Sequence, residues 1–204
     1  MSHLPRGGWG AGAGDDSAPG GPEFAAMIDA LRLLQDRITG AAPPPELLKE
    51  LTRTFEHLAA DLAPHTVPER EQITGHRTDL PGRGQTLVPV FDVEESDEQR
   101  VRGRIRFGRH YLGGNGAVHG GAIPLMFDEM LGRLANTGGR PISRTAYLHV
   151  DYRSITPIGK DLRAEAWFDR EEGRKRFLRG TIHDGDTLCA EAEGLFVQLR
   201  PGQP

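Results

Sequence analysis

The sequence predicts an α+β fold: a long central helix wrapped by an antiparallel sheet of five to six strands, preceded by an amino-terminal helical hairpin. Three features indicate this class. A mostly apolar stretch of helical periodicity follows a glycine-rich loop in the middle of the chain. Two segments of alternating polarity precede that stretch, and further alternating segments joined by tight turns follow it. A helix and a sheet of this kind bury their apolar surfaces against each other.

Length and composition set the general class of the protein. At 204 residues the chain suits one domain with extensions, and its formal net charge of −4 gives no general attraction to nucleic acid. The single cysteine, Cys189, leaves no intramolecular disulfide and is consistent with a reducing compartment, so we expect a cytoplasmic protein. No apolar run approaches the roughly 20 residues that span a bilayer. Residues 1–21 also lack the apolar core of a signal peptide.

Composition divides the chain into four parts. Residues 1–22 are rich in Gly, Ala, Pro and Asp, which cannot bury a core, so we expect a disordered tail. Residues 23–64 form the helical hairpin extension, and residues 65–85 form a polar linker loop with several Pro and Gly. Residues 86–200 carry the alternating segments and the apolar helix, and therefore form the main domain.

The helical hairpin consists of two amphipathic segments. Residues 23–39 and 46–62 each place apolar side chains on one helical face, and residues 40–45 break the helix between them. These apolar faces need a partner. We interpret the hairpin as a packing extension of the main domain, and a small interaction or DNA-binding module is the alternative. Seven acidic residues against four basic ones on the two helices disfavour DNA binding.

The main domain reads as strands before and after its helix. Residues 86–93 and 99–107 alternate in polarity around a charged turn at residues 94–98, as in a hairpin. After the helix, the predicted strands are residues 144–154, 161–169, 175–183 and 187–199, with tight turns between the last three. On the first of these strands, alternation places Thr145, Tyr147, His149 and Asp151 on one face and Ala146, Leu148, Val150 and Tyr152 on the other.

The central helix begins directly after His119-Gly120-Gly121. A helix start leaves several backbone N–H groups unpaired, and without side chains at the two glycines a ligand oxygen can approach these groups closely. The positive end of the helix dipole adds to the attraction, so a developing oxyanion at a carbonyl suits this place. Pro124 fits the first helical turn. The apolar side chains that make this helix mostly buried are Ile123, Met126, Phe127, Met130, Leu131 and Leu134.

Asp128 is the candidate for an inward-facing carboxylate on this helix, with Glu129 beside it. A buried Asp128 would need a hydrogen-bond or ion-pair partner, or it would become protonated. In the alternative, which composition alone favours, both acids are solvated on the helix surface. Gly120 and Asp128 are eight residues apart, which is roughly 12 Å along a helix axis. One ester or thioester cannot touch both groups in one chain. Either the two groups have unrelated roles, or a second copy supplies one of them, and a shared site then requires a homodimer.

The joint spacing of several pieces resembles the hotdog-fold acyl-CoA thioesterases, and most of all their "thioesterase superfamily member" and phenylacetate-pathway branch. The first piece is His-Gly-Gly, followed by an apolar helix with an acid nine residues after the histidine. The resemblance covers about residues 87–199. The downstream pieces are Thr145-Ala146, Val150-Asp151-Tyr152-Arg153, Pro157, Glu172-Gly173-Arg174-Lys175, Glu191-Ala192 and Phe196.

The resemblance implies hydrolysis of an acyl-CoA thioester to a free acid and CoA. Asp128 matches the acid that serves in this family as general base or as nucleophile, and the sequence leaves the two roles open. The Gly120 N–H would polarise the thioester oxygen from the facing subunit. His119 would fix the turn by hydrogen bonding, and Thr145 matches the hydroxyl that orients water or the acid. No metal and no redox cofactor is implied, and the expected assembly is a homodimer or a tetramer.

The resemblance also implies residues that bind the substrate. Asn115 and Gly121 lie in the loop that would meet the substrate carbonyl, although Asn beside Gly is equally typical of a turn. Asp151 falls where relatives contact the substrate, often with Asn. Arg174-Lys175, extended by Arg176, matches the basic turn that meets the CoA phosphates. A second basic set on the strand of residues 99–107 is more simply a solvated strand face: Arg102, Arg104 and Arg106.

Two other functions fit the same fold. A hotdog-fold hydratase or dehydratase has Asp and His paired in one short motif of the form Asp-x-Asn-Pro-x-His. Here Asn115 and His119 lie four residues apart with no Asp before them, so we set this function aside. The other alternative is a non-catalytic acyl-CoA sensor or partner-binding protein whose amino-terminal helices contact a partner. The presence of Asp128 favours catalysis.

Overall fold

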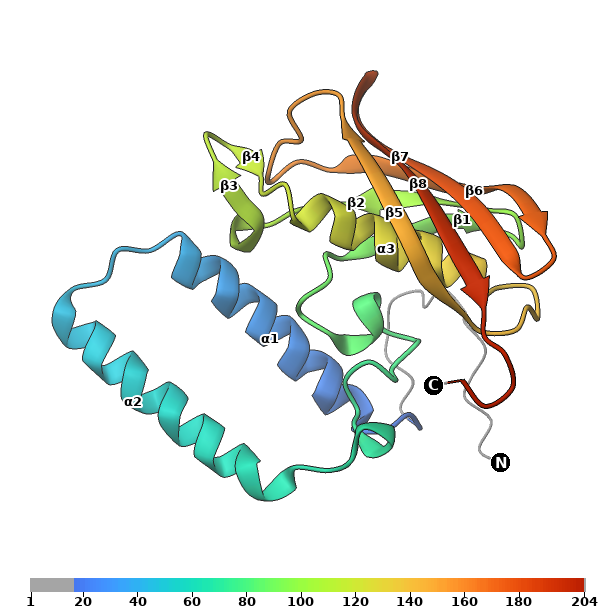
Figure 1. Ribbon diagram of the computed structural model, residues 1–204. Helices are drawn as coiled ribbons and strands as arrows, with labels where there is room; N and C mark the ends of the chain where they lie inside the picture. Colours follow the sequence, from blue (N-terminus) through green and yellow to red (C-terminus); the bar gives the residue numbers. More distant parts are fainter. Residues whose placement is uncertain (1–16, 204) are drawn as a thin grey trace.

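The computed structural model describes residues 17–203 and shows one curved sheet around a helix (Figure 1). The sheet has six strands in the order β1-β2-β6-β7-β8-β5, and all neighbouring strands are antiparallel. Helix α3, Ala122–Ala135, lies against its concave face, which confirms the predicted α+β arrangement. The strands are β1 (Phe91–Ser96), β2 (Arg100–Ile105), β5 (Ser143–Tyr152), β6 (Leu162–Glu172), β7 (Lys175–Asp184) and β8 (Thr187–Gln198).

The core lies between α3 and the sheet. All six apolar residues predicted to bury the helix are at most 2% exposed. Glycines on the sheet permit the close approach: a Cβ at Gly180 would lie 3.1 Å from the Phe127 ring, and one at Gly194 would lie 3.1 Å from Leu131. Each fully buried large side chain stabilises the fold by ~1.5–3 kcal/mol relative to exposure. The helix is therefore fixed in position against the sheet, and its exposed residues are fixed with it.

The first strand lies further along the chain than predicted. It begins at Phe91 rather than at residue 86, and two of the four acids of the predicted turn at 94–98 belong to the strand. Glu94 and Glu95 are on the solvent side, where they form ion pairs with arginines of β2. Asp97 forms the actual turn, because its carboxylate accepts hydrogen bonds from the N–H groups of Gln99 and Arg100. The interpretation of the arginines of residues 99–107 as a solvated face is confirmed, since each is partly or fully exposed and pairs with an acid. The pairs are Arg102–Glu95 and Arg104–Glu94 from β2, and Arg106–Asp161 just after it.

The loop predicted between β2 and α3 contains a second, two-stranded sheet. It is formed by β3 (Leu112–Gly114) and β4 (Ala117–Val118), after a short 3-10 helix at Arg109–Tyr111. Asn115 and Gly116 join the two strands with φ of 50° and 76°, the signs that a type I′ hairpin turn requires at both central residues. The Asn-Gly dipeptide is the signal for this turn, and the sequence interpretation as a plain loop missed it.

The amino-terminal hairpin is present as α1 (Gly21–Thr39) and α2 (Pro45–Leu62). Phe24 and Ile28 of α1 pack with Leu80 of the segment that follows the hairpin. Arg77 of the same segment is only 1% exposed and donates hydrogen bonds to the carbonyls of Pro19 and Gly21 at the start of α1. The second part of the predicted linker, residues 73–85, is therefore packed against α1, and we call it the strap. Residues 1–16 of the predicted tail lie outside the described residues.

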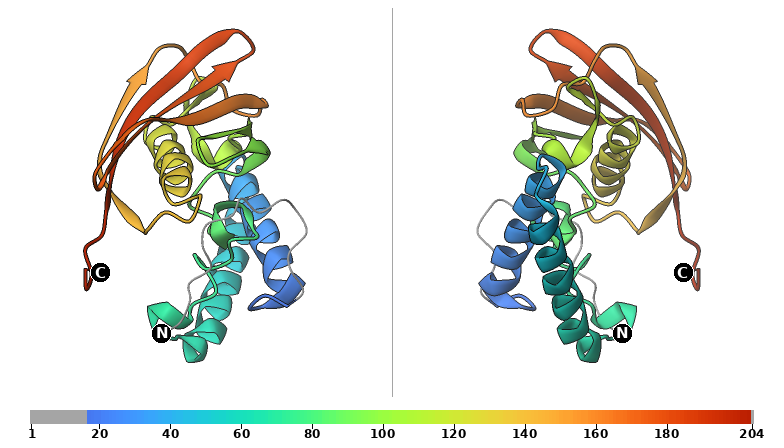
Figure 2. Two further views of the ribbon diagram at one scale, coloured as in Figure 1. Left: turned by 90° about the vertical axis from the view of Figure 1, so that its right-hand side faces the viewer. Right: turned by 90° about the vertical axis from the view of Figure 1, so that its left-hand side faces the viewer.

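Helix α2 differs from α1 because none of its residues is buried. Both helices lie beyond α3, on the side away from the sheet (Figure 2). Neither helix, nor any other in residues 17–203, has the length and apolar character to cross a bilayer. The large apolar side chains that α2 leaves exposed are Leu47, Leu48, Phe55, Leu58 and Leu62.

A bulge in β5 corrects the predicted faces of that strand. Its pairing with β8 shifts by one residue between Thr145 and Tyr147. Thr145 pairs with buried Phe196 and faces α3, whereas Tyr147 and the alternate residues after it face away from the helix. The prediction that Thr145 and Asp151 share a face is wrong, because one inserted residue reverses the side-chain alternation along a strand.

Candidate active site

The turn before α3 is held by backbone and ring hydrogen bonds. The Gly121 N–H donates to Nδ1 of His119 at 3.0 Å, and the Ala122 N–H donates to the His119 carbonyl at 2.9 Å. The structure thus gives His119 a hydrogen bond within the turn. Since Nδ1 accepts this hydrogen bond, a neutral ring in this arrangement carries its own proton on Nε2. Of the two glycine N–H groups, the one at Gly121 is already engaged.

Gly120 offers the other N–H group. Within the described residues this N–H donates to no protein acceptor. Gly120 is exposed, and a Cβ built there would meet nothing nearer than Oη of Tyr152 at 3.7 Å. The Gly120 carbonyl, in contrast, accepts a hydrogen bond from the Tyr152 hydroxyl at 2.6 Å. A free N–H beside a helix start, open to approach, can stabilise a developing oxyanion.

The two neighbouring acids of α3 have opposite environments. Asp128 is exposed and accepts a hydrogen bond from the Thr145 hydroxyl at 2.8 Å. Glu129 is the buried acid, and it pairs with Arg83 at 3.0 Å and with Arg133 at 3.7 Å. Asp128 is therefore not inward-facing in one chain, and Glu129 is not solvated. Burial lowers the pKa of the Arg133 guanidinium, and Glu129 opposes that shift.

The catalytic groups predicted from the sequence lie in two separate places, which we call half-sites. Gly120 lies just before the start of α3, and Asp128 lies in the middle of the helix. Tyr152, the last residue of β5, contacts the first half-site, and Thr145, near the start of β5, contacts the second. Both half-sites therefore lie along the helix-facing side of one edge strand, towards its opposite ends.

Two of the predicted substrate residues lie elsewhere. Asn115 is exposed in the β3–β4 turn, where its positive φ is the structural reason for an Asn. Asp151 faces away from α3 and is paired with Arg153 at 3.0 Å and with His149 at 3.4 Å. The structure brings neither side chain to Asp128 within one chain.

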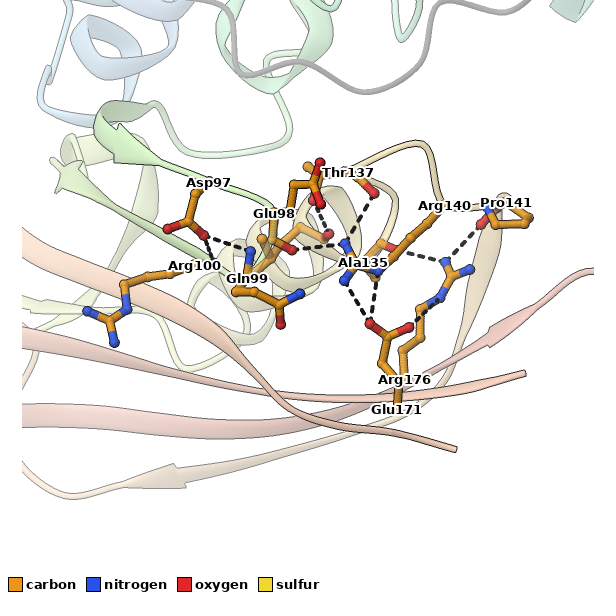
Figure 3. A network of polar contacts seen from close by, with 11 residues as sticks. Asp97, Glu98, Gln99, Arg100, Ala135, Thr137, Arg140, Pro141, Glu171 and Arg176 are labelled. Atoms are coloured by element: carbon orange, nitrogen blue, oxygen red, sulfur yellow. Dashed lines mark hydrogen bonds and ion pairs between the residues drawn. The ribbon is translucent and has the colours of Figure 1, made fainter. Parts of the chain in front are cut away.

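The basic turn between β6 and β7 is divided between surface and core, and Figure 3 shows the contacts of its core residue, Arg176. Arg174 and Lys175 are exposed. Arg176 is 3% exposed and donates to the carbonyls of Ala135, at 2.7 Å, and Pro141, at 2.8 Å, so it caps the end of α3. Burial lowers the pKa of Arg176, while its ion pair with Glu171 opposes that shift. The expectation that Arg176 extends the phosphate-binding turn is therefore wrong.

The register of the sheet places the exposed part of this turn near Thr145. Val197 of β8 pairs with Lys175 on one side and with Arg144 on the other. Lys175 is thus two strand spacings, roughly 10 Å, from the β5 residue beside Thr145. The basic turn and the Asp128 half-site lie at the same end of the sheet.

Sequence reasoning missed two residues of this region. Glu129 was read as solvated, and the ion pair that buries it comes from a strap more than forty residues earlier, which no local pattern reveals. Tyr152 was assigned no role. The alternation of the strand places Tyr152 on the same face as Leu148 and Val150, and this face does pack against the helix, so the pattern could have indicated a contact with the site.

Comparisons with known proteins find thioesterases among the proteins that are similar to this chain. The thioesterase superfamily matches residues 115–191. Acyl-coenzyme A thioesterase THEM4 of Rattus norvegicus is 36% identical over 109 residues, covering 52% of this chain and 46% of that protein. A putative esterase of Pseudomonas aeruginosa is 26% identical over 112 residues, covering 54% of this chain and 83% of the esterase. The chain thus spans about half the length of its THEM4 relatives.

Solved structures extend the likeness beyond the matched segment. The crystal structure of a thioesterase superfamily protein superimposes with a TM-score of 0.73 at 28% identity, covering 89% of this chain and 97% of that one. Zebrafish thioesterase superfamily member 2 shares the fold with a TM-score of 0.50 at 13% identity, over 53% of this chain and 81% of that one. The fold is thus the hotdog fold of thioesterase superfamily structures, and residues 115–191 are similar to that superfamily.

Proposed function

We propose that this protein hydrolyses acyl-CoA thioesters to a free acid and CoA, at a site completed by a second copy of the chain. The observation that carries the proposal is the pairing of two half-sites on one edge strand: an exposed carboxylate held by a hydroxyl, and an unengaged N–H at a helix start. An acyl transfer to water needs both, because one group must activate the attacking oxygen and the other must stabilise the oxyanion.

The chemistry assigns one role to each group. The Gly120 N–H polarises the thioester carbonyl as the tetrahedral oxyanion forms. Asp128 either takes a proton from the attacking water or attacks the carbonyl itself to give an anhydride, which water then cleaves. In both routes the C–S bond breaks, the CoA thiolate leaves and is protonated, and the acid is released. Thr145 holds Oδ1 of Asp128 and leaves Oδ2 free to act.

The shared site follows from the exposed edge of β5. Within residues 17–203 this strand ends the sheet and pairs only with β8. The other edge strand, β1, has six residues and is acidic, features that discourage pairing, whereas β5 has ten residues. If two copies join β5 to β5 in antiparallel fashion, the start of one strand lies opposite the end of the other. Thr145 and Asp128 of one subunit then meet Tyr152 and Gly120 of the partner subunit. The assembly is this dimer, or a tetramer built from two of them.

The substrate class is supported by two observations. The chain's THEM4 relatives are named acyl-coenzyme A thioesterases. The exposed Arg174 and Lys175 lie at the Asp128 end of the sheet, where they can bind the phosphates of CoA. We assign no metal and no redox cofactor to this reaction, because thioester hydrolysis requires neither.

The alternative function is a non-catalytic acyl-CoA sensor or partner-binding protein. The observation that favours it is the apolar side of α2, where several large side chains are exposed on a helix with no buried residue. In that case the protein binds acyl-CoA without releasing CoA.

The deciding experiment measures CoA release from acyl-CoAs of several chain lengths and types, by wild type and by Asp128→Ala. The proposal expects wild-type turnover on at least one substrate class and its near-complete loss in the variant. Binding of acyl-CoA by wild type, with no hydrolysis at any chain length, would show a sensor instead of an enzyme.

A further inference from the structure

The turn that precedes α3 is attached to the segment that follows β5. The Val118 N–H donates to the Thr156 carbonyl at 2.8 Å, and the Ile158 N–H donates to the Gly116 carbonyl at 3.0 Å. These bonds join backbone to backbone, so they do not depend on side-chain identity. They fix the chain on the amino-terminal side of His119.

Gly120 lies beyond these attachments. Glycine has more backbone freedom than any other residue, so the direction of its N–H depends on what holds its neighbours. The Gly120 carbonyl is held by a side chain: it accepts the hydroxyl of Tyr152 at 2.6 Å. The peptide that carries the Gly120 N–H is held by its own carbonyl, that of His119, which accepts the Ala122 N–H, and the next peptide is held by Tyr152, so the turn is fixed on both sides of Gly120.

Tyr152 is well placed to hold this carbonyl. It is the last residue of β5, pairs with Ala190 of β8, and is on the helix-facing side of the sheet. The backbone N–H groups of Arg153 and Ser154 both donate to the Cys189 carbonyl, which anchors the chain just after it. Tyr152 is 54% exposed, so its burial contributes little to the core, and its hydroxyl donates to Gly120.

We infer that Tyr152 is a positioning residue for the oxyanion donor. Its hydroxyl holds the Gly120 carbonyl, and with it the Gly120–Gly121 peptide, so that the turn keeps the shape in which the N–H of Gly120 is open to the thioester oxygen. This inference rests on the proposed function, in which that N–H stabilises the oxyanion. Tyr152 does not touch the reacting atoms in this account; it acts through Gly120.

The kinetic consequence is specific. Loss of the hydroxyl leaves substrate contacts in place but lets the donor reorient, and the N–H interacts more strongly with the transition state than with the substrate. One net hydrogen bond corresponds to about tenfold in rate. Tyr152→Phe should therefore lower kcat by about tenfold and leave KM nearly unchanged.

Tyr147 provides a matched control on the same strand. It is 40% exposed, and its hydroxyl also makes a short hydrogen bond, to Glu193 at 2.7 Å, but on the opposite face of the sheet. Tyr147→Phe removes the same group from the same strand without touching Gly120. Its kcat and KM should stay within about twofold of wild type.

A second measurement is independent of catalysis. Amide hydrogen exchange of Gly121, whose N–H is bonded to His119, reports whether the turn stays closed in the full-length protein. Tyr152→Phe should accelerate this exchange severalfold, and Tyr147→Phe should not. The thermal midpoints of both variants show that the fold is retained.

The outcomes separate the two claims. Slower turnover and faster Gly121 exchange in Tyr152→Phe alone support the inference. Unchanged exchange, unchanged kcat, or equal losses in both variants overturn it. If wild type hydrolyses no acyl-CoA, the proposed function fails and the catalytic half of the inference fails with it, while Gly121 exchange still decides whether Tyr152 holds the turn.

Discussion

The hydroxyl of Thr145 donates to Oδ1 of Asp128 at 2.8 Å and so connects the edge strand β5 to the exposed side of α3. The adjacent Glu129 is turned to the other side of the helix and is held by Arg83 and Arg133. Two neighbouring carboxylates of one helix thus have separate tasks. One is exposed to solvent, and the other attaches the segment of residues 73–85 to the domain.

Replacement of Asp128 by Asn should abolish most activity without loss of stability. The amide cannot act as base or nucleophile, so kcat should fall by about 100-fold or more. Because Asp128 is exposed, the midpoint of thermal unfolding should hardly change. CoA release and thermal melting measure the two effects. Asp186→Asn, in the exposed β7–β8 turn, is the control and should leave both values at wild type.

Replacement of Thr145 by Val should lower kcat through the orientation of Asp128. Valine keeps the shape of the side chain but removes the donor, and we expect a loss of about tenfold, the value of one hydrogen bond to a charged group. Thr145→Ser keeps the hydroxyl and should retain most of the rate. Equal rates for the Val and Ser variants would show that the bond to Asp128 has no part in turnover.

Replacement of Glu129 by Gln should act on stability instead. It removes the charge that pairs with Arg83 and with Arg133, whose side chain is only 14% exposed, so urea unfolding should show a loss of free energy. We expect about 2 kcal/mol, below the ~3–5 kcal/mol of a fully buried pair, since Arg83 is partly exposed. A Glu129→Gln protein as stable as Asp128→Asn would contradict the division of roles between the two acids.

Replacement of Arg174 and Lys175 by Ala should weaken substrate binding. Both are exposed cations that can reach phosphate, so KM for acyl-CoA should rise severalfold at low salt, and the difference should shrink as salt screens the charges. The double variant Arg102→Ala/Arg104→Ala is a control with the same loss of charge, because those arginines pair with Glu95 and Glu94. An equal rise of KM in both double variants would show a general charge effect.

The sequence predicted the helix and most of the strands because their signals are local. The apolar residues of α3 and the alternation along β6 to β8 depend only on side chains a few positions apart. Tertiary geometry decided the remainder. The bulge between Thr145 and Tyr147 moved Asp151 to the far face, and the choice of Glu129 over Asp128 as the buried acid depended on Arg83. The Arg176 side chain entered the core because the end of α3 required a donor.

The most direct test of the shared site combines two inactive variants. Gly120→Val covers the free N–H and fits the fold, as the site is open at a Cβ, and Asp128→Ala removes the carboxylate. Each alone should be inactive as a homodimer. Co-expressed in equal amounts, about half of the dimers are mixed and each of these has one intact site out of two, so about a quarter of the wild-type rate should return. No activity, with mixed dimers confirmed by native mass spectrometry, would place both groups in one chain and contradict the account.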